Sequence, residues 1–193
     1  TKSEEFMEME ARYGAHNYHP LPVVLAKGKG AKVWDVEGKE YYDFLSAYSA
    51  VNQGHCHPAI LKAMAEQAEK LTLSSRAFYN DALGPWEKYV TEYFGYDKVL
   101  PMNTGAEADE TALKLARRWG TMCKGIPNDE VTIVCCEGNF HGRTITIITM
   151  SNDPDSYANY GPLTPGFIRI PYNDPDALEK VLAKDGKKIA GFL

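Results

Sequence analysis

Apolar and polar positions in the first 57 residues predict one short helix followed by a small antiparallel sheet. Residues 3–12 are charged and helix-like, and Ser3 is suited to cap the start of this helix. Glu37-Gly38 separates two apolar stretches and supports a hairpin turn. Three short stretches are predicted as strands: Val23–Leu25, Ala31–Val36 and Glu40–Phe44.

From Pro58 onward the hydrophobic period becomes helical. Pro58 suits the first position of a helix, because the N–H that proline lacks would have no partner there. Two apolar stripes then repeat at the spacing of a core-facing helix. The first consists of Ile60, Met64, Ala68 and Leu71, and the second of Trp86, Tyr89, Val90, Tyr93 and Phe94. We therefore expect two helices in this region.

The rest of the chain alternates between strands and helices. Helices are predicted over Ala106–Trp119 and over Pro175–Leu182, the latter with Asp174 as N-cap. The predicted strands are Lys98–Met102, Val131–Cys136, Phe167–Ile170 and a final one within Lys188–Leu193. This alternation predicts an α/β fold in which helices cross over a mainly parallel sheet. Thr144–Thr149 is the exception, since its β-branched residues favour a strand by propensity alone.

Composition and charge narrow the class of protein. Of the 193 residues, 44% are hydrophobic and 24% charged, which is typical of a globular domain and excludes a disordered or fibrous chain. The 21 Lys+Arg against 26 Asp+Glu give a net charge of -5, which argues against nucleic-acid binding. No apolar run approaches the roughly 20 residues that span a bilayer, so we expect no membrane partner.

The four cysteines do not suggest a disulfide framework. They form no CxxC pair, and two of them are adjacent, so we expect free thiols in a reducing compartment. They are Cys56, Cys123, Cys135 and Cys136.

Two loops that follow predicted strands are candidates for a ligand site. In Asn103–Ala106, Gly105 lets a ligand approach the backbone, and the start of the next helix favours a phosphate. The loop Gly138–Thr144 offers an aromatic ring, an imidazole and a guanidinium suited to a carboxylate. Both loops would lie at the carboxyl edge of the sheet, where ligands gather. Each loop alone is also consistent with an ordinary glycine-bearing turn, and Glu107 and Asp109 are explained as partners of the helix dipole.

A third segment, His55-Cys56-His57, suggests metal binding only superficially. Neighbouring side chains of an extended segment point to opposite sides, and no second ligand pair follows, so we expect no metal site. His57 is better explained as a residue at the helix start before Pro58. Tyr48 and Asn52, which precede it, are equally consistent with packing. Serine-based nucleophilic catalysis has no support, because no GxSxG sequence is present.

With these segments in view, the sequence resembles the class III, or ω-, aminotransferases of fold type I, which use pyridoxal 5′-phosphate. The resemblance runs over essentially the whole chain and is carried by Val51–Pro58, Asn103–Ala108 and Phe140–Thr144. Within the class, the chain is most similar to members that act on ornithine. The segments that carry this narrower likeness are Tyr13–Pro22, Ser46–Asn52, Ser75–Asn80 and Leu100–Gly105.

The resemblance implies a role for each cofactor-facing residue. Gly105 and Ala106 would give backbone N–H groups to the cofactor phosphate, with Thr104 beside them. Phe140 would stack on the pyridine ring, and His141 would line the same pocket. A histidine at this position is usual across the class, whereas some ornithine enzymes carry a tryptophan there.

The resemblance also implies how the substrate is held. Tyr18 and Arg143 would hold the α-amino and α-carboxylate end of ornithine, so that its δ-amino group reaches the cofactor. Tyr48 would help to shape that pocket. The same resemblance places Thr144–Met150 in a short helix, which we adopt over the strand that propensity favours.

Family members also need an aspartate at the pyridine nitrogen and a Schiff-base lysine, and no residue here sits in a matching motif. We therefore expect the chain to be an N-terminal portion, in which Leu193 is not the natural C-terminus. Residues 1–57 would contribute to the small domain, and residues 58–193 would begin the large cofactor-binding domain with its mainly parallel sheet.

The function implied is transfer of the δ-amino group of L-ornithine to 2-oxoglutarate, giving glutamate 5-semialdehyde and glutamate. The alternatives are an aminotransferase for acetylornithine or another ω-amino acid, or a non-catalytic fragment of such an enzyme. A homodimer is expected. The expected location is cytoplasmic, with the mitochondrial matrix as the alternative if a presequence was trimmed.

Overall fold

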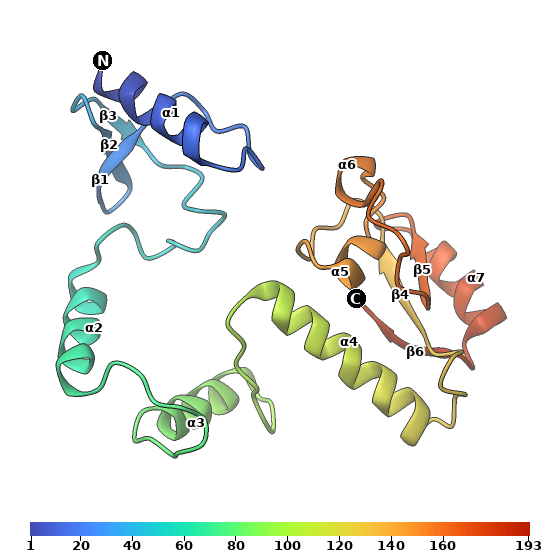
Figure 1. Cartoon of the computed structure of the whole chain (residues 1–193). Coiled ribbons are helices and arrows are strands. Elements are labelled where there is room, and N and C mark those ends of the chain that lie inside the picture. The colour runs from blue at the N-terminus through green and yellow to red at the C-terminus, as the bar shows by residue number, and fades with distance from the viewer. The chain divides into compact units, whose positions relative to one another are not determined.

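The computed structural model describes all 193 residues, which form two compact units, Thr1–Gly84 and Pro85–Leu193. Each unit has its own three-stranded sheet (Figure 1). The first sheet is antiparallel and the second is parallel. The α/β class with a parallel sheet, expected from the sequence, is therefore confirmed.

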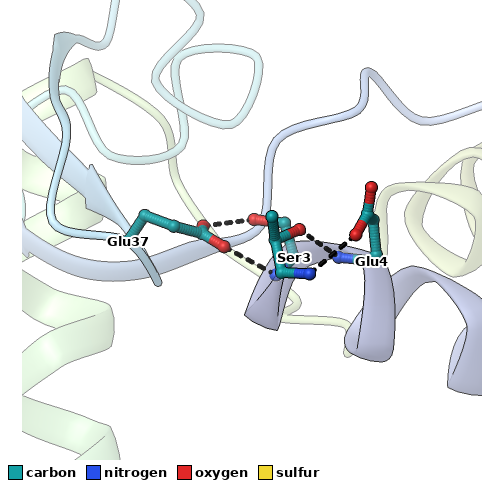
Figure 2. A network of polar contacts seen from close by, with 4 residues as sticks. Ser3, Glu4 and Glu37 are labelled. Atoms are coloured by element: carbon teal, nitrogen blue, oxygen red, sulfur yellow. Dashed lines mark hydrogen bonds and ion pairs between the residues drawn. The ribbon is translucent and has the colours of Figure 1, made fainter.

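Helix α1 (Lys2–Tyr13) begins one residue before the predicted range 3–12 and ends one residue after it. Thr1 is the N-cap: its hydroxyl accepts a hydrogen bond from the N–H of Glu4 at 3.2 Å, and the Glu4 carboxylate binds the amino terminus in return. The prediction of Ser3 as N-cap is thus wrong. Ser3 lies in the first turn, where its N–H donates to Glu37 at 2.9 Å and its hydroxyl donates to the same carboxylate (Figure 2).

The antiparallel sheet of the first unit has the order β1-β2-β3, with β1 at Leu25–Lys29, β2 at Lys32–Asp35 and β3 at Glu40–Tyr42. The last two strands and the hairpin between them are confirmed, with shorter ends. The strand predicted at Val23–Leu25 is wrong except for its last residue, because pairing with β2 begins only at Leu25. The turn after β2 is built by Asp35, whose carboxylate accepts from the N–H groups of Glu37 and Lys39 at 3.1 and 2.8 Å.

Both helices predicted after Pro58 are present. Helix α2 (Pro58–Lys70) has proline in its first turn, and α3 (Leu83–Phe94) carries the second apolar stripe. Neither helix has a buried residue within this chain. Their apolar stripes are therefore exposed surface here, with Ile60 at 53% and Trp86 at 44% exposure.

The parallel sheet of the second unit has the order β5-β4-β6. Its strands are β4 (Thr132–Cys136), β5 (Phe167–Ile170) and β6 (Ile189–Phe192). The strand β4 pairs with both neighbours in parallel. The chain between successive strands must therefore return to the opposite end of the sheet, as a crossover connection does. Residues of β4 alternate between the two faces, which gives the unit two apolar clusters.

On one face, Ile133 and Cys135 pack with helix α4 (Gly105–Met122) through Leu113 and with α5 (Ile145–Thr149) through Ile147. Burial raises the pKa of the Cys135 thiol to about 11, so this cysteine acts as a core residue. On the other face, Val134, Ile170 and Ile189 pack with helix α7 (Pro175–Asp185). Asp174 caps α7, as predicted, by accepting from the N–H of Ala177 at 2.9 Å.

Of three segments between the main elements, one agrees with the prediction, one contradicts it, and one forms a helix that was not predicted. Thr144–Met150 contains the short helix α5, so the resemblance was right and strand propensity was overridden by the burial of Ile147 and Ile148. The strand predicted at Lys98–Met102 is wrong, since no strand pairs with it and Pro101 lacks an N–H for a ladder. A further short helix, α6 (Pro154–Tyr157), was not predicted.

Candidate functional site

The start of α4 has features that favour a bound anion. Thr104 is its N-cap, and the hydroxyl accepts from the N–H of Glu107 at 3.1 Å, while its carbonyl accepts from Ala108 at 3.0 Å. The N–H groups of Gly105 and Ala106 have no acceptor within the helix, because a helix offers none to its first turn. The dipole of this 18-residue helix adds partial positive charge at the same place.

The backbone at this helix start is also open to a ligand. A Cβ built on Gly105 would meet no atom within 4 Å. A phosphate can therefore approach the two N–H groups directly. A longer side chain at this position would keep the phosphate further away. The donor set at this position, two backbone N–H groups and a hydroxyl, fits the phosphate of a bound cofactor.

The second candidate loop, residues 138–144, follows the carboxyl end of β4. Its base is fixed by Asn139, whose side-chain amide donates to the carbonyls of Cys136 at 2.6 Å and Met150 at 2.7 Å. The N–H of Gly138 donates to the side chain of Asn152 at 2.8 Å. These three bonds tie the start of the loop to the end of β4 and to the residues that follow α5.

The two loops predicted to share one sheet edge do lie together. Gly142 has φ +129°, and a Cβ built on it would stand 2.8 Å from the Cβ of Ala106. The imidazole of His141 contacts the carboxylate of Asp109 through Nδ1 at 3.2 Å. The hydroxyl of Thr144 donates to Glu110 at 2.5 Å. The loop is thus fastened along the first two turns of α4.

The loop that lies against the start of α4 carries three side chains of different chemistry. The ring of Phe140 is 72% exposed, so a face remains accessible for stacking against a planar ligand. The ring of His141 is 21% exposed and is held by its partner on α4. Arg143 is exposed and carries the one guanidinium of the loop.

The other two predicted site residues, Tyr18 and Tyr48, belong to the first unit. Tyr18 lines a groove of about 950 Å³ between α1 and residues 14–25. Tyr48 lies in a left-handed turn, Ser46–Ser49, in which all four residues have positive φ. Left-handed backbone is costly for residues other than glycine, so surrounding contacts must hold this turn.

Asp43 supplies those contacts. Its Oδ1 accepts from the N–H groups of Leu45 at 3.0 Å and Ser46 at 2.8 Å, and its Oδ2 lies 2.6 Å from Nε2 of His55. The hydrogen bond from His55, followed by that from Ser46, lowers the pKa of Asp43 below its ordinary value. His55 in turn pairs with Gly30 through the backbone.

The remaining histidine of the His55-Cys56-His57 segment has a structural role as well. His57 is the N-cap of α2, and its Nδ1 accepts from the N–H of Ala59 at 3.3 Å. No group of three or more His, Cys, Asp or Glu side chains is placed to hold a metal ion. None of the helices combines the length and apolar character that crossing a membrane requires.

Sequence reasoning missed the acidic residues that fasten the site, namely Asp43, Asp109 and Glu110. Asp109 was explained as a partner of the helix dipole, whereas in the structure it holds His141. The only signal available was the presence of carboxylates near a histidine-bearing loop, and the pairing spans 32 residues of sequence.

Comparison with known proteins identifies the family. Residues 13–192 match the model of the aminotransferase class-III family, and the chain belongs to that family. It is 58% identical to "Ornithine aminotransferase, mitochondrial" from Arabidopsis thaliana, covering 100% of this chain and 41% of the relative. It is 61% identical to the protein of the same name from Rattus norvegicus, covering 99% of this chain and 43% of the relative.

Solved structures show the same relationship. The ornithine aminotransferase from Toxoplasma gondii, whose structure is described with partial occupancy of PLP, matches with a TM-score of 0.96 at 50% identity, over 98% of this chain and 44% of that one. Acetylornithine aminotransferase from Elizabethkingia anophelis matches with a TM-score of 0.84 at 64% identity, over 98% of this chain and 46% of that one. The chain therefore spans less than half the length of the relatives it matches.

Proposed function

We propose that the full-length gene product binds pyridoxal 5′-phosphate at the start of α4. The observation that carries this proposal is the junction of two loops: an open helix start at Gly105 lies against the loop of residues 138–144. Gly105 and Ala106 bind the phosphate through their N–H groups, with Thr104 beside them. Phe140 stacks on the ring, and His141 lines the same site.

The chain's own residues then act by binding and orientation. When bound, the cofactor supplies an electron sink and a carrier for an amino group. Phe140 covers one ring face and excludes water from it. Arg143 holds the α-carboxylate of the substrate through its planar guanidinium, which leaves the far end of the substrate at the reacting centre.

The proposed reaction is transfer of the δ-amino group of L-ornithine to 2-oxoglutarate, giving glutamate 5-semialdehyde and glutamate. Relatives named ornithine aminotransferase, at 58–61% identity over nearly the whole chain, support this substrate. In this proposal Tyr18 accepts a hydrogen bond from the α-amino group, and Tyr48 shapes the pocket. Residues 1–57 contribute to a small domain, and residues 58–193 begin the large one.

A second candidate substrate is N-acetylornithine. It is favoured by the 64% identity to the Elizabethkingia anophelis protein of that name. Arg143 does not discriminate, because both substrates carry an α-carboxylate. The difference lies at the α-nitrogen, which is charged in ornithine and acylated in acetylornithine.

The full-length product with added pyridoxal phosphate tests the reaction directly. With L-ornithine and 2-oxoglutarate, we expect glutamate and glutamate 5-semialdehyde in equal amounts. N-acetylornithine and 4-aminobutyrate serve as comparison substrates. Absence of product from ornithine, with turnover of acetylornithine, would establish the second candidate instead.

Gly105→Pro tests the phosphate site. Proline is compatible with the first helical position and with the extended backbone of Thr104 (φ -136°, ψ 162°), but it removes one proposed donor. A lost bond to a charged group is worth about 1.5–3 kcal/mol, so we expect cofactor affinity to fall about ten- to a hundredfold. Melting temperature without cofactor should stay unchanged, and unchanged affinity would contradict the assignment.

We further propose a homodimer in which the segment Leu73–Asn80 approaches the partner's site. Leu73 is 85% exposed and Phe78 73% exposed, which is more apolar surface than one loop ordinarily leaves to water. Sedimentation of an active monomer at micromolar concentration would contradict this.

The compartment is proposed from the cysteines and from the relatives. The four cysteines are unpaired, which fits a reducing compartment. The names of the Arabidopsis and rat relatives include the word mitochondrial, which supports the matrix over the cytoplasm. Fractionation of cells that express the full-length product distinguishes the two.

A further inference from the structure

The pair formed by Asp109 and His141 defines which nitrogen of the imidazole carries a proton. Nδ1 of His141 lies 3.2 Å from Oδ2 of Asp109. A carboxylate can only accept a hydrogen bond, so Nδ1 must be the donor. The neutral ring is therefore the Nδ1–H tautomer, and its Nε2 is an acceptor.

The surroundings of Asp109 and His141 keep the hydrogen bond between them in place. The side chain of His141 is 21% exposed and that of Asp109 is 26% exposed, so water competes poorly with the bond. Asp109 lies on a regular helix, and the loop is held against that same helix just after His141, by Gly142 against Ala106 and by Thr144 to Glu110. The ring consequently has little freedom to turn away from its partner.

We propose that Asp109 is a positioning residue, which holds His141 as the Nδ1–H tautomer and presents Nε2 to the ligand bound beside the start of α4. This inference rests on the proposed function, since it names the pocket where Nε2 acts. Without an acceptor at Nδ1, a neutral imidazole in water prefers its proton on Nε2. Removal of Asp109 therefore converts an acceptor that faces the ligand into a donor.

Nitrogen-15 NMR of the histidine side chains tests this proposal in the cofactor-free full-length product. Spectra at about pH 8.5, roughly two units above the ordinary histidine pKa, report the neutral ring. His141 is assigned by its disappearance in His141→Gln. We expect the wild-type signals of a protonated Nδ1 and an unprotonated Nε2. An Nε2–H pattern in the wild type would overturn the proposal without any further variant.

Three variants separate orientation from general loosening of the loop. Asp109→Asn keeps an oxygen acceptor and should retain the Nδ1–H pattern. Asp109→Ala should shift His141 toward the Nε2–H pattern. Glu110→Ala, the matched control, removes the bond to Thr144 from the same helix turn and should leave the His141 nitrogen signals unchanged. Equal signals in Asp109→Ala and the wild type, or an equal shift in Glu110→Ala, would overturn the proposal.

Cofactor titration supplies an independent measurement. Asp109→Ala should weaken binding of pyridoxal phosphate by about three- to tenfold, the factor that one net hydrogen bond represents, whereas Asp109→Asn should change it little. If the wild type binds no cofactor, the proposed function fails, while the nitrogen signals still decide the role of Asp109. If the tautomer shifts and affinity does not, the ligand-facing part of the inference is wrong.

Discussion

Gly142 connects the two halves of the candidate site because it has no side chain. Its φ of +129° lies where other residues are strained, and its Cα faces Ala106 so closely that an added Cβ would stand 2.8 Å away. Contacts of this length do not occur between methyl groups, so any side chain must displace the loop from α4. The glycine is therefore required by geometry and not only by flexibility.

Gly142→Ala should destabilise the chain by about 1–3 kcal/mol, since strain and steric overlap act at the same residue. Urea unfolding measures the loss. Gly84→Ala is the matched control, because its Cβ would meet nothing within 4 Å and its backbone is helical. Gly84→Ala should keep or slightly raise stability. Equal stability of both variants would contradict the close docking of the loop.

For single residues, the sequence predicted the local role of a residue better than the partner that its side chain contacts. The glycines of both loops and the capping role of Asp174 follow from local chemistry, and the structure bears out the capping and places the loops together. The pairing of Asp109 with His141 depends on how a loop docks on a helix 32 residues away. Local patterns contain no information about that docking.

The sequence predicted helices and strands well where local residues determine the secondary structure. It predicted them poorly where packing or pairing with another element determines it. Helices α2, α3, α4 and α7 follow from apolar period and caps. The segment Lys98–Met102 has a strand-like sequence but no paired neighbour, so it is not a strand. Thr144–Met150 has strand propensity, yet it forms a helix in which Ile147 and Ile148 are buried, and Ile147 packs against α4 and β4. In both segments, strand pairing and burial by neighbouring elements decide the structure more than local propensity does.

The segment that carries Tyr48 depends on one carboxylate. Asp43 accepts from the N–H groups of Leu45, just before the left-handed turn, and of Ser46, its first residue, and it pairs with His55. Its folded pKa is lowered, first by the bond from His55, so ionisation of Asp43 favours the folded state. That contribution is complete above the ordinary pKa of aspartate, about 3.9, and is lost as pH falls through the lower folded value.

Asp43→Asn should therefore reduce stability at pH 7 and reduce the loss of stability on acidification below about pH 4. Thermal unfolding between pH 7 and pH 2.5 measures both effects. Asp176→Asn, on the first turn of α7, serves as the comparison. Parallel curves for the wild type and Asp43→Asn would show that this carboxylate does not hold the turn.

For the whole molecule, membership of the class-III aminotransferase family rests on a match over residues 13–192 and on solved relatives with TM-scores up to 0.96. Of the residues predicted for the site, Tyr18 and Tyr48 belong to the first unit, and Thr104–Ala106, Phe140, His141 and Arg143 belong to the second. The choice of substrate is the central claim that these similarities leave to experiment, because relatives with similar sequences bear the names of two different enzymes.

Tyr18 is the residue proposed to make that choice. A hydroxyl that accepts from a charged α-amino group is left unpaired by a substrate without one, and its ring closes the space that an acetyl group would occupy. A buried polar group left without its partner costs about 1–3 kcal/mol. In the proposed function, Tyr18 would therefore serve both recognition of ornithine and rejection of acetylornithine.

The most direct test is the ratio of kcat/KM for L-ornithine and N-acetylornithine in the full-length product loaded with pyridoxal phosphate, for the wild type and Tyr18→Phe. The wild type should prefer ornithine, and Tyr18→Phe should lower kcat/KM for ornithine about ten- to a hundredfold, with a much smaller effect on 4-aminobutyrate. A wild-type preference for acetylornithine, or a preference for ornithine that Tyr18→Phe leaves unchanged, would contradict the account.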